Sequence, residues 1–243
     1  MTTKQATGLL PRSDAGATPP LDWLSILAFG AIGWPWLLRS LSGGRPAEKQ
    51  ALLAALELPA DALPTLGSWK ADVAFLEEIA GAIAALRPAT VVELGSGASS
   101  LIAARALERH GGGLLIGFDQ HADFVEATRA WLAEYGLTAD LRAVDLVPSP
   151  AGWPGRWYDL HHLPERIDLL IVDGPPWTVH PFVRGAAAHL FDRIPPGGIV
   201  LLDDAARPGE RVVAARWRKE WPDFDFRLDT RGTKGTLIGT RLR

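Results

Sequence analysis

The stretch from Val91 to Ser100 constrains the fold of this chain more than any other. Its sequence, VVELGSGASS, places two β-branched apolar residues and an acid before a short loop that contains two glycines. The apolar residues that follow, from Leu101 to Leu107, recur at helical spacing. The stretch therefore predicts a buried strand, a tight loop and the start of a helix. Such a loop lets the backbone approach a ligand and leaves the N-terminal amides of the helix free to bind it.

The acid before the first glycine, Glu93, narrows the kind of ligand. In a dinucleotide site the loop faces a pyrophosphate, which a neighbouring carboxylate would repel. A ligand that carries an ammonium group would instead be attracted, and Glu93 would hold it directly or through a water molecule. The loop therefore indicates a nucleotide-like ligand with a cationic group.

Apolar strands alternate with helices after this loop. Five segments have the length and composition of buried strands: Thr90–Leu94, Leu114–Asp119, Leu141–Asp145, Leu169–Asp173 and Ile199–Asp203. Helical patterns lie between several of them, most clearly over Asp123–Tyr135 and Val183–Arg193. This alternation predicts an α/β fold with a parallel sheet covered on both faces. Near the C-terminus, Phe224–Leu228, a turn and Thr236–Gly239 predict an antiparallel hairpin at the sheet edge.

The first 66 residues do not follow this pattern. Residues 1–20 are small, polar and rich in proline, and we expect a disordered tail. Residues 21–66 hold an uncharged apolar run and a helical pattern from Ala47 to Leu58, and we expect a helical N-terminal extension or lid. Residues 67–243 form the expected main domain, with Ser68 as the expected cap of its first helix.

The uncharged run from Trp23 to Leu38 has two interpretations. It is shorter than a membrane-spanning helix requires, and Pro35 interrupts it. Its three tryptophans and the neighbouring Arg39 suit a membrane interface. A helix that packs on the domain, or a flap over the active site, is the alternative. We expect a cytoplasmic protein, with membrane-surface contact through residues 23–38 left open.

Each of the five predicted parallel strands ends at or near an acid. These acids are Glu93, Asp119, Asp145, Asp173 and the pair Asp203–Asp204. Ligands of open α/β sheets bind in the crevice outside the carboxyl ends of the strands. Asp119 ends the second strand, where an acid binds the hydroxyls of a ribose, and Asp145 is placed to accept a hydrogen bond from an adenine amine. The alternative for each acid is a helix cap or a turn.

Four blocks, in order along the chain, carry a resemblance to a known family. They are Glu93–Gly97, Phe118–Asp119, Ile167–Pro176 and Pro195–Asp204. With these blocks the chain resembles the class I S-adenosylmethionine-dependent methyltransferases over about residues 67–243. The resemblance implies a Rossmann-like three-layer sandwich with a seven-stranded, mostly parallel sheet and an antiparallel last strand. It also implies S-adenosylmethionine as the cofactor. The expected cofactor-binding residues are Glu93, Gly95, Ser96, Gly97, Asp119, Gln120 and Asp145.

The acids after the fourth and fifth strands suggest where the chemistry occurs. Methyl transfer to a hydroxyl requires that the hydroxyl lose its proton, to a base or through metal coordination. Asp173, Asp203 and Asp204 offer oxygen ligands that suit Mg²⁺ or another divalent cation. Here the chain resembles the metal-dependent O-methyltransferases, which implies that all three are catalytic metal ligands, with Asp173 as a candidate base. The alternative is an ion pair, since Arg207 lies close by in the sequence.

Several other residues have a functional and a structural interpretation. Trp69 is a candidate cover for the cofactor, His180 a candidate base and Arg184 a candidate ligand of an acidic acceptor. The aromatic cluster around Trp157 and Tyr158 is a candidate wall of the acceptor pocket. Packing, capping or exposure to solvent is the alternative for each.

The predicted function is therefore methyl transfer to a small molecule or sugar, most simply O-methylation. A nicotinamide-dependent oxidoreductase is an alternative, against which stand Ser100 at the third glycine position of the dinucleotide motif and Glu93. A non-catalytic cofactor-binding scaffold is another. The net charge of −3 gives no reason to expect nucleic-acid binding, and the absence of cysteine excludes disulfides and thiolate metal sites.

Overall fold

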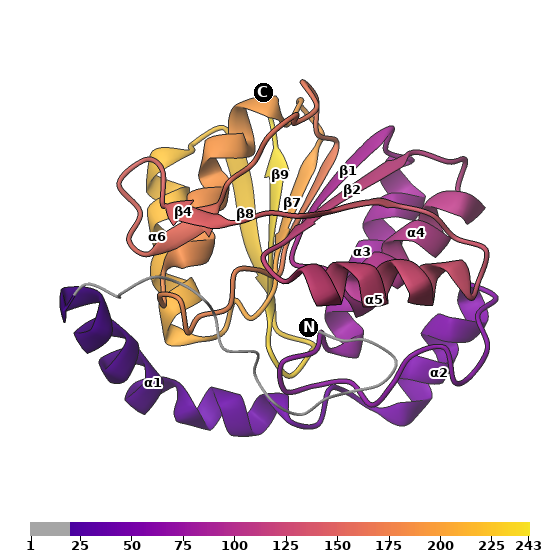
Figure 1. Cartoon of the computed structure of the whole chain (residues 1–243), viewed down its shortest axis with the longest axis horizontal. Coiled ribbons are helices and arrows are strands. Elements are labelled where there is room, and N and C mark those ends of the chain that lie inside the picture. Colours follow the sequence, from indigo (N-terminus) through magenta and orange to yellow (C-terminus); the bar gives the residue numbers. More distant parts are fainter. Residues whose placement is uncertain (1–19) are drawn as a thin grey trace.

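The computed structural model describes residues 20–243 and shows a twisted seven-stranded sheet (Figure 1). The strand order is β3-β2-β1-β6-β7-β9-β8. The strands are β1 (Thr90–Leu94), β2 (Leu114–Asp119), β3 (Asp140–Ala143), β6 (Leu169–Val172), β7 (Ile199–Leu202), β8 (Phe224–Asp229) and β9 (Thr236–Arg241).

The pairing of the strands confirms the predicted fold class. Five strands, β3, β2, β1, β6 and β7, run parallel to one another. Strand β9 lies between β7 and β8 and is antiparallel to both. In this register Leu202, the last residue of β7, lies opposite Leu237 near the start of β9. The turn between β8 and β9 therefore lies at the edge of the sheet where the parallel strands end.

Alternation along the strands divides the core into two layers, as period-2 side-chain geometry requires. In β1, Val91 packs with the helices on one face and Val92 with those on the other. The first face carries α2 (Pro46–Ala55), α3 (Val73–Leu86), α4 (Ala98–Arg109) and α5 (Ala122–Ala133). The second face carries η1 (Val183–Arg193), which is a run of 3-10 turns, and α6 (Pro208–Glu220).

Two local expectations need correction, and one element was not predicted. Asp72, not Ser68, caps α3: its carboxylate accepts a hydrogen bond from the backbone N–H of Phe75 at 2.9 Å. The strand expected over Leu141–Asp145 ends at Ala143. A separate small hairpin follows, formed by β4 (Leu146–Pro148) and β5 (Arg156–Tyr158). Strands of three residues carry too short a pattern for sequence periodicity to detect.

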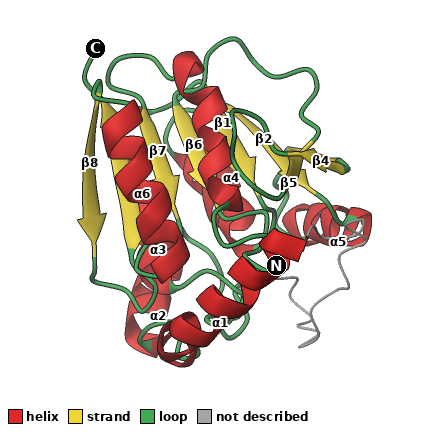
Figure 2. Ribbon diagram, turned by 90° about the vertical axis from the view of Figure 1, so that its left-hand side faces the viewer, coloured by secondary structure: helices red, strands yellow, loops and turns green. Residues whose placement is uncertain are grey.

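The N-terminal extension begins with α1 (Pro20–Ser40), which runs across the end of the sheet toward which the parallel strands point (Figure 2). The predicted tail, apart from residue 20, lies outside the described residues. Trp23, Leu27, Trp34 and Leu38 lie on the outward side of α1 and are exposed. Among the described helices, none combines the length and the apolar character that crossing a membrane demands.

Candidate active site

The loop between β1 and α4 has the close backbone approach that its glycines predict. Gly95 has a φ of +94°, and a Cβ there would lie 2.9 Å from the backbone nitrogen of Gly174, in the loop after β6. Gly97 has a φ of +150° and precedes the first turn of α4. These values favour glycine at both positions, because other residues rarely adopt such a backbone. The two loops that follow β1 and β6 are thereby held against each other.

Asp119, at the end of β2, orders this loop from the neighbouring strand. One of its carboxylate oxygens accepts hydrogen bonds from the backbone N–H of Ser96 at 3.0 Å and from its hydroxyl at 3.4 Å. The other oxygen accepts from the N–H of His121 at 2.9 Å. Burial raises the pKa of Asp119, and the two backbone donors oppose that rise. The structure thus brings Ser96 and Asp119 together as the sequence predicts.

Glu93 is completely buried at the same edge. One of its oxygens accepts a hydrogen bond from the Ser100 hydroxyl at 2.5 Å, whereas the other has no hydrogen-bond partner among the described residues. Burial raises the pKa of Glu93 to about 8. A ligand ammonium group would supply the positive charge that the protein does not place beside this carboxylate.

Two more polar side chains have unpartnered atoms here. The amide of Gln120, next to Asp119, has neither its oxygen nor its nitrogen paired within the described chain. The Tyr158 hydroxyl is buried and likewise unpartnered there, and a Cβ on Gly174 would lie 2.1 Å from it. Buried polar atoms without partners are unusual in native proteins and call for an explanation. We refer to Glu93, Ser96, Asp119, Gln120 and Tyr158 as the loop cluster.

The loop cluster fits the polar parts of S-adenosylmethionine. Glu93 and the N-terminus of α4 would hold its amino-acid moiety, and Asp119 with Gln120 its ribose hydroxyls, as the strand-end geometry allows. Asp145 does not join this group: it is exposed and lies two residues beyond the end of β3. Its predicted contact with the adenine stays a prediction.

Three carboxylates meet at the ends of β6 and β7, as the sequence predicts. One oxygen from each of Asp173, Asp203 and Asp204 lies within 4.8 Å of the others. Asp203 and Asp204 are buried, whereas Asp173 is half-buried. Asp204 has a φ of +59°, which turns the chain sharply after β7. The distances alone would suit a divalent cation.

Basic side chains already occupy the space around these carboxylates. Arg184, from η1, is buried and donates to Asp204 at 3.0 Å and to Asp173 at 3.3 Å. Its other hydrogens go to backbone carbonyls, including those of Pro175 and Asp203 at 3.2 Å. The structure does not favour Arg184 as a ligand of an acidic acceptor, because its guanidinium donates its hydrogen bonds to carboxylates and carbonyls of the protein itself.

Two further cations complete the set. Arg207 lies 2.7 Å from the same oxygen of Asp204 that Arg184 contacts. Lys234 lies 3.3 Å from the other oxygen of Asp204 and 3.4 Å from Asp203. We refer to Asp173, Asp203, Asp204, Arg184, Arg207 and Lys234 as the ion-pair cluster.

The charges of the cluster explain the different behaviour of its two buried carboxyls. Burial by itself would raise the pKa of Asp204, but Arg207, Lys234 and Arg184 hold it below its ordinary value. Burial and the adjacent Asp204 raise the pKa of Asp203 well above its usual range.

The donor set does not fit a resident divalent metal. A metal ligand must offer free lone pairs, and a divalent ion is repelled by cations beside it. Both oxygens of Asp204 contact basic side chains, and one oxygen of Asp203 contacts Lys234, whereas Oδ1 of Asp203 is buried without a partner among the described residues. A metal held by all three carboxylates would have to displace at least one buried ion pair. The sequence alternative, in which Arg207 pairs with an aspartate, is confirmed by the contact with Asp204.

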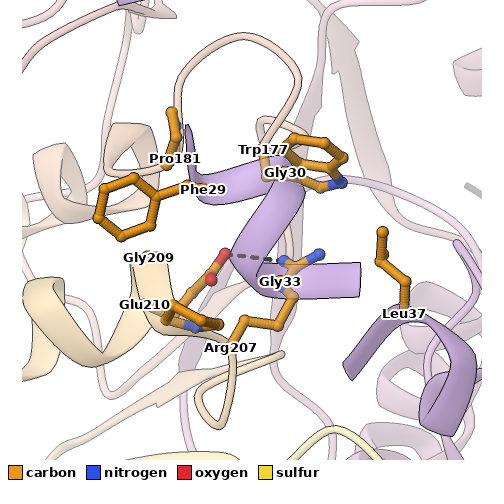
Figure 3. Close-up of a pocket in the computed structure, with 10 residues that line it drawn as sticks. Phe29, Gly30, Gly33, Leu37, Trp177, Pro181, Arg207, Gly209 and Glu210 are labelled. Carbon is orange, nitrogen blue, oxygen red and sulfur yellow. Dashed lines mark hydrogen bonds and ion pairs between the residues drawn. The ribbon is translucent and has the colours of Figure 1, made fainter. Parts of the chain in front are cut away.

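The helix α1 lies across a hollow from Arg207, one member of the ion-pair cluster. This small hollow of about 20 Å³ lies between α1, α6 and the loop after β6, as Figure 3 shows. Gly30 of α1 faces Trp177, and Arg207 contacts Glu210 at 2.7 Å on the other side of the hollow. The ring of Trp177 in turn stacks on Trp69, with centroids 6.4 Å apart. Trp69 therefore lies over the loop after β6.

His180 has a structural role in this arrangement. It is buried, and its Nδ1 accepts a hydrogen bond from the N–H of Phe182 at 3.1 Å. Its Nε2 lies 3.9 Å from a carboxylate oxygen of Asp22 on α1. Burial lowers the pKa of His180, so the ring is neutral near pH 7. These contacts tie α1 to the loop after β6.

Comparison with known proteins gives one match to a family model. Residues 92–205 match the family model described as a methyltransferase domain. No curated protein sequence matches the chain.

Three solved structures share the fold. The SAH-bound methyltransferase PaMTH1 from Podospora anserina is 15% identical, with a TM-score of 0.55 over 94% of this chain and 100% of that one. The O-methyltransferase from Bacillus cereus in complex with SAH is 12% identical, with a TM-score of 0.52 over 89% of this chain and 99% of that one. The O-methyltransferase TomG from Streptomyces achromogenes, in complex with SAM, is 16% identical, with a TM-score of 0.50 over 82% of this chain and 89% of that one.

The matched segment runs from β1 into the loop after β7. It includes the loop cluster and, from the ion-pair cluster, Asp173, Arg184, Asp203 and Asp204, whereas Arg207 and Lys234 lie beyond it. Together with the observed strand order, the match supports a class I S-adenosylmethionine-dependent methyltransferase.

Proposed function

We propose that this protein transfers the methyl group of S-adenosylmethionine to an oxygen of a small molecule or sugar. The single observation that carries the cofactor assignment is the loop cluster, with unpartnered polar atoms on Glu93, Gln120 and Tyr158 around a helix N-terminus. Two of the structures with this fold are named O-methyltransferases, which supports oxygen as the acceptor atom.

Asp173 is the proposed proton acceptor. It is the least buried carboxylate of the ion-pair cluster, since its side chain is 16% exposed and that of Asp204 is 6% exposed. It follows β6, beside the loop that Gly95 contacts, so it borders the loop cluster. When bound, the cofactor supplies an electrophilic methyl group on a sulfonium. The protein aligns the acceptor hydroxyl with that group, and Asp173 removes the hydroxyl proton.

Calorimetry tests the cofactor assignment. S-adenosylhomocysteine should bind the full chain, and NAD should not. Binding of NAD without binding of S-adenosylhomocysteine would support the oxidoreductase alternative instead. A screen of a metabolite extract for methyl groups transferred from labelled S-adenosylmethionine then identifies the acceptor. Asp173→Asn should abolish that transfer and leave S-adenosylhomocysteine binding intact, whereas a non-catalytic scaffold would transfer nothing in either form.

A second proposal concerns the outward side of α1, which we propose meets an anionic membrane surface. Trp23, Leu27, Trp34 and Leu38 follow one stripe of the helix at successive spacings of four, seven and four residues. The stripe carries no acid, and Arg39 follows it. Co-sedimentation with anionic vesicles should fall in the Trp34→Ser variant and stay unchanged in Val212→Ser, an exposed apolar position on α6. Equal binding by both variants would refute the proposal.

A further inference from the structure

Lys234 occupies the position that a metal ion would need in the ion-pair cluster. Its ammonium lies 3.4 Å from an oxygen of Asp203 and 3.3 Å from an oxygen of Asp204. It therefore bridges the two adjacent carboxylates, as a divalent cation would. The side chain of Lys234 is 2% exposed, so water does not screen these contacts. A buried ammonium with two carboxylate partners is a fixed part of the site.

The fold brings Lys234 to this position from a distant part of the chain. Because β9 lies antiparallel beside β7, the residues just before β9 meet those just after β7. The N–H of Ala206 donates to the carbonyl of Lys234 at 3.0 Å, and the N–H of Ala205 donates to that of Gly235 at 2.9 Å. The loop that carries Asp203 and Asp204 is thus joined by backbone hydrogen bonds to the turn that carries Lys234.

Asp72 holds the same turn from its other side. One oxygen of this buried carboxylate caps α3, and the other accepts from the N–H of Thr233 at 2.6 Å and of Lys234 at 3.2 Å. A Cβ on Gly232 would lie 2.3 Å from that second oxygen, so glycine is needed for the approach. Lys234 is therefore anchored through its backbone on both sides, and its side chain points into the carboxylates from a rigid turn.

Two arginine side chains supply the remaining positive charge around the carboxylates. Arg184 contacts both Asp173 and Asp204, and Arg207 contacts Asp204. A divalent ion placed among the carboxylates would face three buried positive charges. Asp203 keeps one buried oxygen, Oδ1, without a partner among the described residues, whereas both oxygens of Asp204 contact basic side chains. Only the departure of Lys234 would free an oxygen of Asp204 next to Asp203 for the ion.

We propose that Lys234 is the resident cation of this site and that the protein binds no divalent metal there. Asp203 and Asp204 serve to fix Lys234 and the turn, and Asp173 remains for the acceptor. The part of the proposal that concerns Asp173 rests on the proposed function, whereas the exclusion of metal does not. The ammonium group of Lys234 thus has the structural role that a metal ion would otherwise have between the ends of β6 and β7.

Cation binding to the full chain tests this proposal without any need for the acceptor. The wild-type protein, freed of metal with EDTA, is titrated with Mn²⁺, and free Mn²⁺ is followed by electron paramagnetic resonance. We expect no bound Mn²⁺ at the site and no rise in Tm with Mg²⁺ or Mn²⁺ beyond that of a matched ionic strength. Stoichiometric Mn²⁺ binding that Asp203→Asn removes would overturn the proposal.

For the variant Lys234→Met we expect the opposite result, namely that it binds Mn²⁺. Methionine keeps the length of the side chain and removes its charge, so Asp203 and Asp204 lose their shared cation. We expect this variant to gain saturable Mn²⁺ binding and a Tm that rises with Mn²⁺, because ligand binding to the folded state stabilises it. Lys219→Met, at an exposed position on α6, is the matched control and should stay indifferent to the metal. A folded Lys234→Met protein that binds no Mn²⁺ would contradict the assigned role of Lys234.

Lys234→Arg keeps the charge and should stay indifferent to metal. The measurement on the wild-type protein decides the matter even where Lys234→Met does not fold. Failure of the proposed function is seen separately, as the absence of S-adenosylhomocysteine binding, and leaves the Mn²⁺ result unchanged.

Discussion

Two neighbouring regions at the carboxyl edge of the sheet use the same kind of residue in opposite ways. After β1 and β2, the buried acids Glu93 and Asp119 are met by serine hydroxyls and backbone amides. After β6 and β7, the buried acids Asp203 and Asp204 are met by basic side chains. Both pairs follow parallel strands and lie at the same edge. The difference is whether the chain itself provides the compensating charge.

This contrast distinguishes the proposed cofactor site from the ion-pair cluster. Burial raises the pKa of Glu93 to about 8, since no cation of the described chain pairs with it. After β7, Arg207, Lys234 and Arg184 hold the pKa of Asp204 low, although burial opposes them. A buried carboxylate without a partner invites a ligand, whereas a buried carboxylate with three cations is already satisfied. Each of the following substitutions alters one of these two groups of acids or their partners.

Arg184→Met should have the largest effect, on stability. The change leaves Asp204 and Asp173 with one cation fewer and removes donors from several backbone carbonyls. Removal of one member of a buried ion pair costs about 3–5 kcal/mol of unfolding free energy. Urea denaturation measures the loss. Arg211→Met, at an exposed position on α6, is the control and should change stability by less than about 0.5 kcal/mol. A loss no larger than that of the control would mean that the cluster does not hold the β6 and β7 ends together.

Asp119→Ala should have the next largest effect, on ligand binding. The carboxylate both orders the Ser96 loop and is the expected partner of the ribose hydroxyls. Two lost hydrogen bonds to a charged group weaken binding of S-adenosylhomocysteine by about 100-fold. Calorimetry measures this, with Asp225→Ala on the exposed side of β8 as the control. Unchanged affinity in Asp119→Ala would place the ligand elsewhere.

Glu93 predicts a pH dependence of stability in the ligand-free protein. Its folded pKa of about 8 lies above the ordinary value of 4.5, so the folded state binds this proton more tightly than the unfolded state does. The protonated Glu93 therefore contributes to the unfolding free energy in full below pH 4.5, and this contribution is lost as the pH rises through 8. Between these values, the unfolding free energy should fall by up to about 1.4 kcal/mol per pH unit.

Glu93→Gln tests that prediction, because the amide does not titrate. The variant should lose the decline in stability between pH 5 and 8, which denaturation at several pH values measures. Glu108→Gln, at an exposed position on α4, should keep the wild-type profile. A Glu93→Gln protein with that same profile would show that the carboxyl ionises as readily when folded as when unfolded.

The sequence predicts the strands and the loop cluster well, for a local reason. Buried parallel strands are continuous apolar runs, and the acids that matter follow them directly, as Asp119 follows β2. Lys234 carries no such signal. It lies in a polar, glycine-flanked turn that is typical of an exposed hairpin, and only the insertion of β9 between β7 and β8 brings it to Asp203. Asp72 also escaped prediction, because its role depends on a turn that lies about 160 residues further along the chain.

Tyr158→Phe should have the smallest effect and tests the loop cluster most directly. The Tyr158 hydroxyl belongs to the short strand β5, and it is buried against Gly174 without a partner in the described chain. Removal of an unsatisfied buried hydroxyl should leave the stability of the free protein unchanged or raise it by up to about 1 kcal/mol. If the hydroxyl instead pairs with the ligand, the affinity for S-adenosylhomocysteine should fall by about 5-fold to 10-fold. Opposite signs in the two measurements identify a polar group kept for a ligand rather than for folding. Loss of stability without loss of affinity would place Tyr158 among the structural contacts, together with Arg184.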